Sequence, residues 1–267
     1  MADENVTDAA EPGGGKNPVV PEAVSRSEGF FGEHASSVYD ERAADMFDPV
    51  VVTPIVEMLA DLAREGAALE FGIGTGRIAL PLAERGVRVH GIDDSEAMVA
   101  RLRSKPGGED IGVTIGDFAT TRVDGQFSLV YLVFNTIFNL VTQDEQVACF
   151  ENAAAHLHSG GRFVIETGVP GLQSLPLGQT IIPFRADPEG MSFDVYDVVT
   201  QRFSSQHYVF ADGGVQTYPV ELRYAWPSEL DLMARLGGMT LRNRWAGWQR
   251  EPFTSLSCAH VSVYEKP

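Results

Sequence analysis

The stretch Glu70-Phe71-Gly72-Ile73-Gly74-Thr75-Gly76 decides the fold of this 267-residue chain. It closes a short apolar run, residues 67–71, and it precedes apolar residues at helical spacing, namely Ile78, Leu82 and Ala83. Three glycines at alternate positions remove Cβ atoms where the chain turns sharply and where a ligand would press on the backbone. The helix that follows would offer free backbone N–H groups to an anionic group. The stretch therefore predicts a strand, a ligand-binding turn and a helix.

Strand-like and helical segments alternate on both sides of this turn. The predicted helices cover residues 50–62, 78–83, 96–102, 144–157 and 227–236, the last with Ser228 as its expected cap. The predicted strands cover residues 67–71, 87–92, 113–115, 127–133, 163–165, 240–245 and 260–264. Such alternation predicts a parallel sheet with helices on both faces and right-handed crossovers.

The pattern changes in the last third of the chain. Three extended segments follow one another, at residues 193–199, 205–210 and 216–223, and Asp212-Gly213-Gly214 is a strong hairpin signal between the last two. We expect an antiparallel insertion over about residues 170–225 that caps the cleft. Alternation places half of its polar and aromatic side chains on each face without saying which half, and these are Tyr196, Arg202, His207, Tyr208, Arg223 and Tyr224. Trp226, Trp245 and Trp248 are expected to pack in the core or the terminal hairpin.

Composition excludes several classes of protein. The formal net charge is -17 at pH 7, and nucleic acids and anionic membranes bind clustered basic side chains, so neither is an expected partner. No apolar run reaches the roughly 20 residues of a membrane span. Cys149 and Cys258 lack metal-ligand spacing and no carboxylate set suggests a cation, so we expect no metal and two reduced thiols in a cytoplasmic protein.

The N-terminal segment differs from the rest of the chain. Residues 1–28 hold Asp, Glu, Pro and a Gly13-Gly14-Gly15 run with few large apolar side chains, and they lack the pattern of a signal peptide. Such a segment buries too little surface to offset its ordering entropy. We expect a disordered tail over residues 1–28 and one folded domain over residues 29–267.

Asp93 adds a second ligand-binding signal, because it ends the strand that follows the glycine turn. An acidic side chain there can accept two hydrogen bonds from a ribose diol. Gly74, Gly76 and Ala79 also satisfy the dinucleotide fingerprint, so the glycines alone fit two classes of ligand.

Three motifs in order resemble the class I S-adenosylmethionine-dependent methyltransferase family. They are the glycine stretch at residues 70–76, Gly91-Ile92-Asp93, and Gly116-Asp117-Phe118, and the resemblance covers most of the chain from about Tyr39 onward. With the alternation of segments, it implies a doubly wound, mostly parallel seven-stranded α/β sheet of the Rossmann-like kind, with a small antiparallel insertion as cap. Residues 29–267 would then be a methyltransferase domain, and S-adenosyl-L-methionine would be its cofactor.

The resemblance also implies which residues hold that cofactor. The acid that opens the glycine loop, Glu70, helps hold the methionine end, and Asp93 binds the ribose. The loop glycines let the cofactor lie against the backbone, while Met98 packs on the adenine and the turn at Asp117 contacts its amino group. The full implied set is Glu70, Gly72, Gly74, Gly76, Asp93, Met98, Asp117 and Phe118.

The acceptor site is expected beyond the carboxyl ends of the strands. Asn135 follows the fourth strand and is either a pocket wall or a turn-capping amide. Glu166 follows the fifth strand and either binds an acceptor amine or hydroxyl or forms an ion pair with an arginine. Tyr39 either covers the cofactor or contacts the acceptor, as in related methyltransferases, or it packs within an N-terminal lid with Phe30 and Phe31. We take Glu166, Asn135 and Tyr39 as the candidate catalytic residues.

Within the family, the chain looks most like bacterial natural-product tailoring N-methyltransferases. The order of glycine loop, Glu166, antiparallel insertion and terminal hairpin is similar to the aminosugar N,N-dimethyltransferases, although those tend to carry a histidine at the position of Asn139. Residues 232–235 and 251–254, together with Asn135-Thr136, look similar to peptide α-amino methyltransferases. Both acceptor types stay open.

The expected reaction is methyl transfer to an amine or hydroxyl of a small molecule or short peptide by in-line displacement. Two alternatives stay open. One is an NAD(P)-dependent oxidoreductase, which would need a catalytic Tyr–Lys pair, and no lysine here follows a tyrosine at short helical spacing. The other is a protein that binds the cofactor without catalysis. The methylated atom and the oligomeric state, including a homodimer, are also left open.

Overall fold

The fold is built on a seven-stranded β-sheet, seen in a computed structural model that describes residues 40, 44–211 and 213–267. Its strands are β1 (Ala68–Phe71), β2 (Val89–Asp93), β3 (Gly112–Ile115), β4 (Phe127–Leu132), β5 (Leu157–Gly168), β10 (Thr240–Trp245) and β11 (Ala259–Glu265). They lie in the order β10-β11-β5-β4-β1-β2-β3, in which β11 is antiparallel to both of its neighbours and the other pairs are parallel. The predicted doubly wound, mostly parallel sheet is confirmed.

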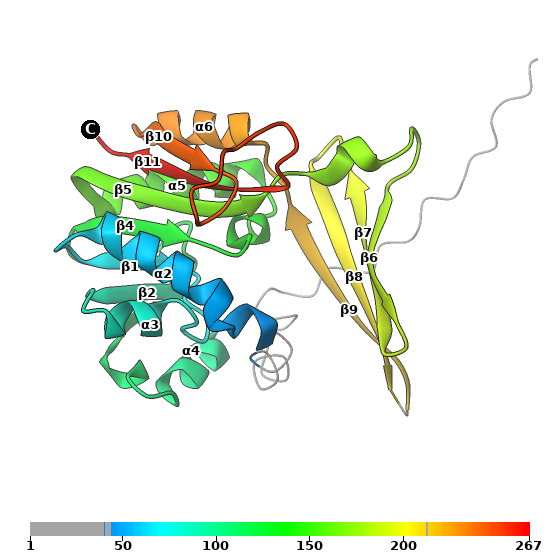
Figure 1. Cartoon of the computed structure of the whole chain (residues 1–267), viewed down its shortest axis with the longest axis horizontal. Coiled ribbons are helices and arrows are strands. Elements are labelled where there is room, and N and C mark those ends of the chain that lie inside the picture. The colour runs from blue at the N-terminus through cyan, green and yellow to red at the C-terminus, as the bar shows by residue number, and fades with distance from the viewer. Residues whose placement is uncertain (1–39, 41–43, 212) are drawn as a thin grey trace, which may run out of the picture.

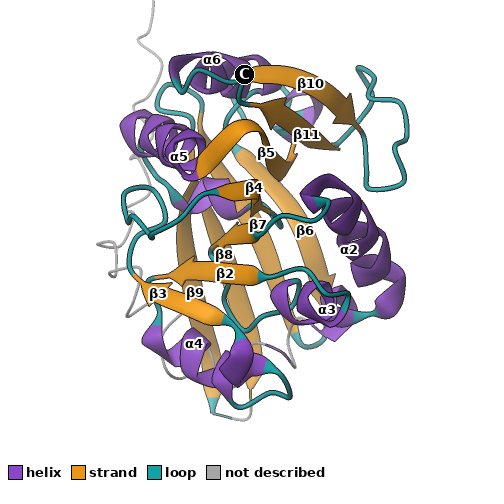
Figure 2. Ribbon diagram, turned by 90° about the vertical axis from the view of Figure 1, so that its left-hand side faces the viewer, coloured by secondary structure: helices purple, strands orange, loops and turns teal. Residues whose placement is uncertain are grey.

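Helices cover both faces of this sheet (Figure 2). They are α2 (Pro49–Ala63), α3 (Ala79–Glu84), α4 (Glu96–Arg103), α5 (Gln143–His156) and α6 (Pro227–Leu236), with short 3-10 turns η1 (Ala44–Phe47), η2 (Gly108–Asp110), η3 (Thr136–Asn139) and η4 (Gly171–Ser174). Alternate strand residues reach opposite layers: Ala68 and Leu129 pack with α2, whereas Leu69 and Val130 pack with α5 and α6. The continuous apolar strands are therefore buried on both faces.

Local capping fixes where the helices begin. Asp48 accepts a hydrogen bond from the Val50 N–H (2.8 Å) at the start of α2, and Thr142 and Glu145 form a capping box at the start of α5. The sequence-based expectation that Ser228 caps α6 is wrong. Trp226 occupies that position, because Pro227 with its fixed φ already serves as the first helical residue.

A second, four-stranded antiparallel sheet is inserted between β5 and α6, and we call it the cap sheet. Its strands are β6 (Ile181–Asp187), β7 (Gly190–Asp197), β8 (Arg202–Ala211) and β9 (Gly214–Arg223), in the order β6-β7-β8-β9. Figure 1 shows this sheet standing apart from the main sheet, opposite the ends of its strands. The three extended segments expected here correspond to β7, β8 and β9. The sequence analysis missed β6, which is mostly exposed and contains Pro183 at a shift in register.

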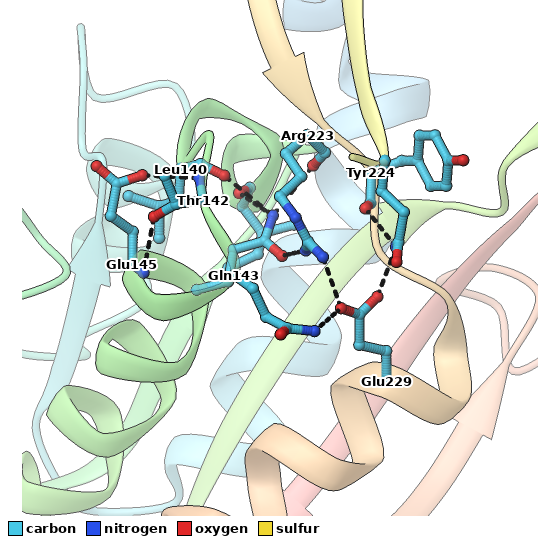
Figure 3. A network of polar contacts seen from close by, with 10 residues as sticks. Leu140, Thr142, Gln143, Glu145, Arg223, Tyr224 and Glu229 are labelled. Carbon is cyan, nitrogen blue, oxygen red and sulfur yellow. Dashed lines mark hydrogen bonds and ion pairs between the residues drawn. The ribbon is translucent and has the colours of Figure 1, made fainter. Parts of the chain in front are cut away.

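A buried polar network anchors the base of the cap sheet to α5 and α6 (Figure 3). Arg223, at the end of β9, donates hydrogen bonds to the Gln146 side chain and to Glu229 (2.7 Å). Glu229 also accepts from the side-chain amides of Gln143 and Gln201, each at 2.7 Å. Gln146 in turn donates to the Arg223 carbonyl (3.0 Å), so both the main chain and the side chain of Arg223 are held. The network ties the cap sheet to the faces of two helices.

The topology sets the place of the site. From β1 the chain winds outward through β2 and β3 in one direction and through β4 and β5 in the other, so the switch point lies between β1 and β4. Ligands in open α/β sheets bind beyond the carboxyl ends of the strands at such a point. Among the described helices, none has the length and apolar character that crossing a bilayer requires.

Candidate active site

A cavity of about 640 Å³ lies between the carboxyl edge of the main sheet and the cap sheet. Its floor comes from the glycine loop after β1 and from the ends of β2, β4 and β5, and its roof comes from β7, β8 and β9. Seven of the eight implied cofactor-binding residues line it, and these are Glu70, Gly72, Gly74, Asp93, Met98, Asp117 and Phe118. Asn135 lines it as well.

The first and third glycines of the loop lie in different surroundings. Gly72 has φ +68°, and a Cβ there would lie 2.8 Å from the Thr136 Cγ2, so a side chain would close the cavity floor. Gly76 has φ +81° and does not line this cavity; a Cβ there would lie 2.3 Å from the Leu102 side chain. The structure thus places Gly76 against α4, and its implied contact with the cofactor stays a prediction.

Asp93 is held by the backbone on both sides. Its Oδ2 accepts from the Gly74 N–H (2.7 Å) and its Oδ1 from the Ser95 N–H (2.9 Å), and the residue is 8% exposed. Burial raises the pKa of Asp93 to about 6, although the two backbone hydrogen bonds act to lower it. Asp94 beside it is exposed and also lines the cavity. The sequence analysis passed over Asp94, although two acids in a row at a strand end are a visible signal.

Glu70 and Arg77 form a second charged feature at the mouth of the loop. Glu70 is 4% exposed, accepts a hydrogen bond from the Tyr131 hydroxyl (2.9 Å), and has its pKa raised to about 8 by burial, against the lowering effects of Tyr131 and Arg77. The Arg77 guanidinium lies over the Phe134 ring, 3.6 Å from its centroid. Its Nη1 is buried and has no hydrogen-bond partner in the part of the chain that the structure describes.

These two groups fit the methionine end of the implied cofactor. An amino-acid group carries a carboxylate for an unpartnered guanidinium nitrogen and an ammonium for a buried carboxyl group. Gly72 leaves room for that end, since a side chain there would meet Thr136. The residues present therefore fit S-adenosylmethionine, and Arg77, which the sequence analysis missed, joins the candidates that hold it.

Apolar and polar groups of the cavity lining are suited to the adenine. Met98 on α4 is buried, and Phe118 packs on Phe71 with ring centroids 6.0 Å apart. Asp117 accepts a hydrogen bond from the Ala119 N–H (2.8 Å), which fixes the turn that bears it. The structure thus places all three implied adenine contacts on the cavity lining, and their contact with adenine stays a prediction.

The three candidate catalytic residues are placed differently. Asn135 has φ +60° and uses its side-chain oxygen to accept from the Gly168 N–H (2.6 Å), which joins the ends of β4 and β5. Glu166 does not line the cavity, and its carboxylate accepts from the Phe134 N–H (2.8 Å) in the same turn. Tyr39 lies outside the described residues. Catalytic roles for all three stay predictions.

The inner face of the cap sheet supplies the roof. Of the six polar and aromatic residues whose facing the sequence left open, Tyr196, Arg202, His207 and Tyr224 line the cavity, and Tyr208 and Arg223 do not. The roof also holds side chains that the sequence analysis did not single out, among them Asp194, Phe203 and Ser205. Trp226, Trp245 and Trp248 pack against the core clusters, as expected.

Comparisons with known proteins agree with this geometry. Residues 68–161 match a family model described as a methyltransferase domain. The CcbJ methyltransferase from Streptomyces caelestis is 37% identical, with 90% of this chain and 98% of that chain covered and a TM-score of 0.79. The cypemycin N-terminal methyltransferase from a Streptomyces species is 27% identical over 240 residues, which cover 86% of this chain and 98% of that protein. A similar fold occurs in CalS10, an amino pentose methyltransferase from Micromonospora echinaspora that is involved in calicheamicin biosynthesis and was solved with S-adenosylmethionine bound. It is 20% identical, with a TM-score of 0.64, and the match covers 88% of this chain and 98% of that chain.

Proposed function

Because the chain belongs to the S-adenosylmethionine-dependent methyltransferases, we propose that it methylates an amine nitrogen of a small molecule or peptide bound beneath the cap sheet. The observation that carries this proposal is the charge of the cavity. Its described lining contains two guanidinium groups, Arg77 and Arg202, and no lysine, against the carboxylates of Asp93, Asp94, Asp117, Asp194 and Glu221, with Glu70 mostly protonated at pH 7. Arg202 is paired with Glu221 (3.6 Å). A cavity of this charge attracts a cationic acceptor.

The names of two relatives support the same class of acceptor. One is named for the N-terminus of cypemycin and the other for an amino pentose. Neither the matched family nor these relatives support the oxidoreductase or the non-catalytic binding protein that the sequence analysis left open.

The residues present divide the task. When bound, S-adenosylmethionine supplies a methyl group on a sulfonium, which a nucleophile displaces in line. Glu70 and Arg77 are suited to hold the methionine end of the cofactor, and Asp93 is suited to hold its ribose. The floor of the cavity would thereby set the position of the transferable methyl group. The cap sheet closes the opposite side, where it can orient the acceptor and exclude water.

The direct test follows a labelled methyl group from the cofactor to a panel of acceptors. We would use a tripeptide with a free α-amino group, an aminohexose and a cyclic secondary amine, each beside its N-acetylated form and a hydroxyl analogue. We expect label on the free amines and none on the acetylated forms. Label on hydroxyl analogues alone, or on no amine, would overturn the proposal.

Cofactor binding should release a proton near neutral pH. With its pKa raised to about 8, Glu70 is mostly protonated at pH 7 in the free protein. A bound ammonium beside it favours the ionised form, so affinity should rise from pH 6 to pH 8 by up to about tenfold per pH unit. Calorimetry at pH 7 in phosphate and in Tris should give different binding enthalpies, because the buffers take up the proton with different heats. In Glu70→Gln the difference should vanish; equal enthalpies for the unsubstituted protein would contradict the assignment.

A further inference from the structure

A carboxylate on the inner face of the cap sheet belongs to the roof of the cavity, whereas the residues implied to hold the cofactor belong to its floor. Asp194 on β7 lines the cavity, and its Oδ2 accepts a hydrogen bond from the Tyr196 hydroxyl (3.3 Å). Its Oδ1 is buried and has no hydrogen-bond partner among the residues that the structure describes. A buried acceptor without a donor costs free energy, so this oxygen indicates a donor that belongs to a ligand.

A group of aromatic rings lines the cavity next to Asp194, which it meets through the Tyr196 hydroxyl. Tyr196 stacks on Phe203, with centroids 5.0 Å apart and an angle of 16° between the rings. Tyr224 lies 5.9 Å from Tyr196, and Phe138 meets Phe203 edge-on at 5.8 Å. Aromatic rings and a carboxylate that line one cavity form a site for a cation that also carries apolar groups, which describes an alkylammonium ion.

The surroundings of Asp194 favour a proton acceptor. Burial raises its pKa, and the nearby polar side chains of Ser205, Tyr196 and His207 act to lower it, with the pKa staying above its ordinary value of 3.8. The titratable groups around it are Tyr196 on its own strand, His207 on β8 and Tyr224 after β9. The facing residue of β6, Ile182, carries no charge.

Beside Asp194, on the neighbouring strand β8, the side chain of Ser205 contacts His207. Ser205 pairs with Asp194 across the two strands, and its Oγ lies 3.2 Å from the His207 Nε2. The His207 Nδ1 lies 3.1 Å from the Ser192 Oγ. This row of polar groups fixes the strand face on which Asp194 stands.

We propose that Asp194 binds the acceptor amine as its ammonium ion and takes its proton, so that a neutral amine faces the methyl group. This inference rests on the proposed function. In the first step an N–H bond breaks, an O–H bond forms at Asp194 Oδ1, and the electron pair stays on nitrogen. In the second step that pair forms the N–C bond while the C–S bond breaks and its electrons leave with sulfur. Asp194 then returns its proton to solvent as the methylated product, again an ammonium, departs.

The test compares the unsubstituted protein with Asp194→Asn, using whichever amine of the panel accepts the methyl group. At pH 7 we expect kcat/KM to fall by about 100-fold, the usual contribution of a general base, with cofactor affinity unchanged by calorimetry. The deficit should shrink as the pH approaches the pKa of the amine in solution, because the amine then arrives neutral. Asp194→Glu keeps the carboxylate and should recover part of the lost kcat/KM. That recovery would show that the site tolerates a substitution at this position. Glu189→Gln removes an exposed carboxylate from the turn between β6 and β7 and should behave as the unsubstituted protein.

Two failures can be told apart. If the amines are methylated and Asp194→Asn retains kcat/KM within about threefold, or shows the same deficit at every pH, the role of Asp194 is overturned while the proposed function stands. If the unsubstituted protein methylates only hydroxyl analogues, or no amine, the proposed function falls and this inference falls with it.

Discussion

Replacement of Asp93 by alanine is expected to weaken S-adenosylmethionine binding by about 1,000-fold. Each Asp93 oxygen already accepts one backbone hydrogen bond, from Gly74 or Ser95, and keeps a second lone pair for a ribose hydroxyl. A hydrogen bond to a charged group contributes about 1.5–3 kcal/mol, so the loss of two such bonds gives a factor of this size. The substitution also releases the Gly74 backbone, which the Asp93 side chain holds in the loop. The dissociation constant from calorimetric titration measures the effect.

Two further variants make this result specific. Asp110→Ala removes an exposed carboxylate at the end of η2 and should leave the dissociation constant unchanged, which controls for net charge. Asp94→Ala removes the neighbouring carboxylate of the cavity wall. Unsubstituted affinity in Asp93→Ala, with the large loss in Asp94→Ala instead, would move the ribose contact by one residue and contradict our assignment.

The second large effect concerns stability. Glu229→Gln should lower the free energy of unfolding by about 3 kcal/mol, because it leaves the buried Arg223 guanidinium without its counter-charge. Burial acts to raise the pKa of Glu229, but hydrogen bonds from Arg223, Gln201 and Gln143 outweigh it and hold the pKa below its ordinary value of 4.5. A depressed carboxyl pKa stabilises the fold above that ordinary value, and the stabilisation is lost as the pH falls through the folded-state pKa. The difference between variant and unsubstituted protein, measured by urea unfolding, should therefore narrow below pH 4.5.

An exposed ion pair on the cap sheet provides the control for Glu229→Gln. Arg185 and Asp187 on β6 are 2.6 Å apart, with side chains 44% and 38% exposed. Because exposed pairs contribute little, Asp187→Asn should leave the urea midpoint within error of the unsubstituted protein. Equal effects of Glu229→Gln and Asp187→Asn would show that the network in Figure 3 does not anchor the cap sheet.

The sequence was most informative where a local pattern alone determines the structure. Helix α6 and strand β10 have the bounds expected from periodicity, and the other elements of the main sheet were located to within a few residues, except for β5. That strand begins at Leu157, directly after α5, whereas the pattern predicted a strand only over residues 163–165. Two glycines, Gly160 and Gly161, weaken the apolar pattern there, and the strand exists because β4 and β11 pair with it.

The sequence predicted one part of the candidate site, the floor of the cavity, and did not predict the other, its roof. Motif spacing located the floor of the cavity, because the glycine loop and the strand ends that follow it depend on a regular topology. The roof needed the three-dimensional structure, since alternation separates Asp194 and Tyr196 from their neighbours without saying which set faces inward. Asn135 was correctly placed beyond the end of β4. Glu166 was expected after the fifth strand, but it lies within β5, which extends to Gly168, and there it pairs with Val261 of β11. Their hydrogen bonds to backbone N–H groups depend on the turn at Phe134, whose positive φ no residue pattern signalled.

The connectivity of the cap sheet has a consequence for how such proteins diversify. Every strand of the roof lies in one uninterrupted segment, residues 181–223, whereas the matched methyltransferase domain ends at residue 161. A recombination event at the two flanking connections can therefore exchange the whole roof of the cavity in one step and leave the coding sequence of its floor untouched. Chimaeras that replace residues 181–222 with the matching segment of a relative, and so keep the Arg223–Glu229 ion pair, would test whether this roof determines which acceptor is methylated.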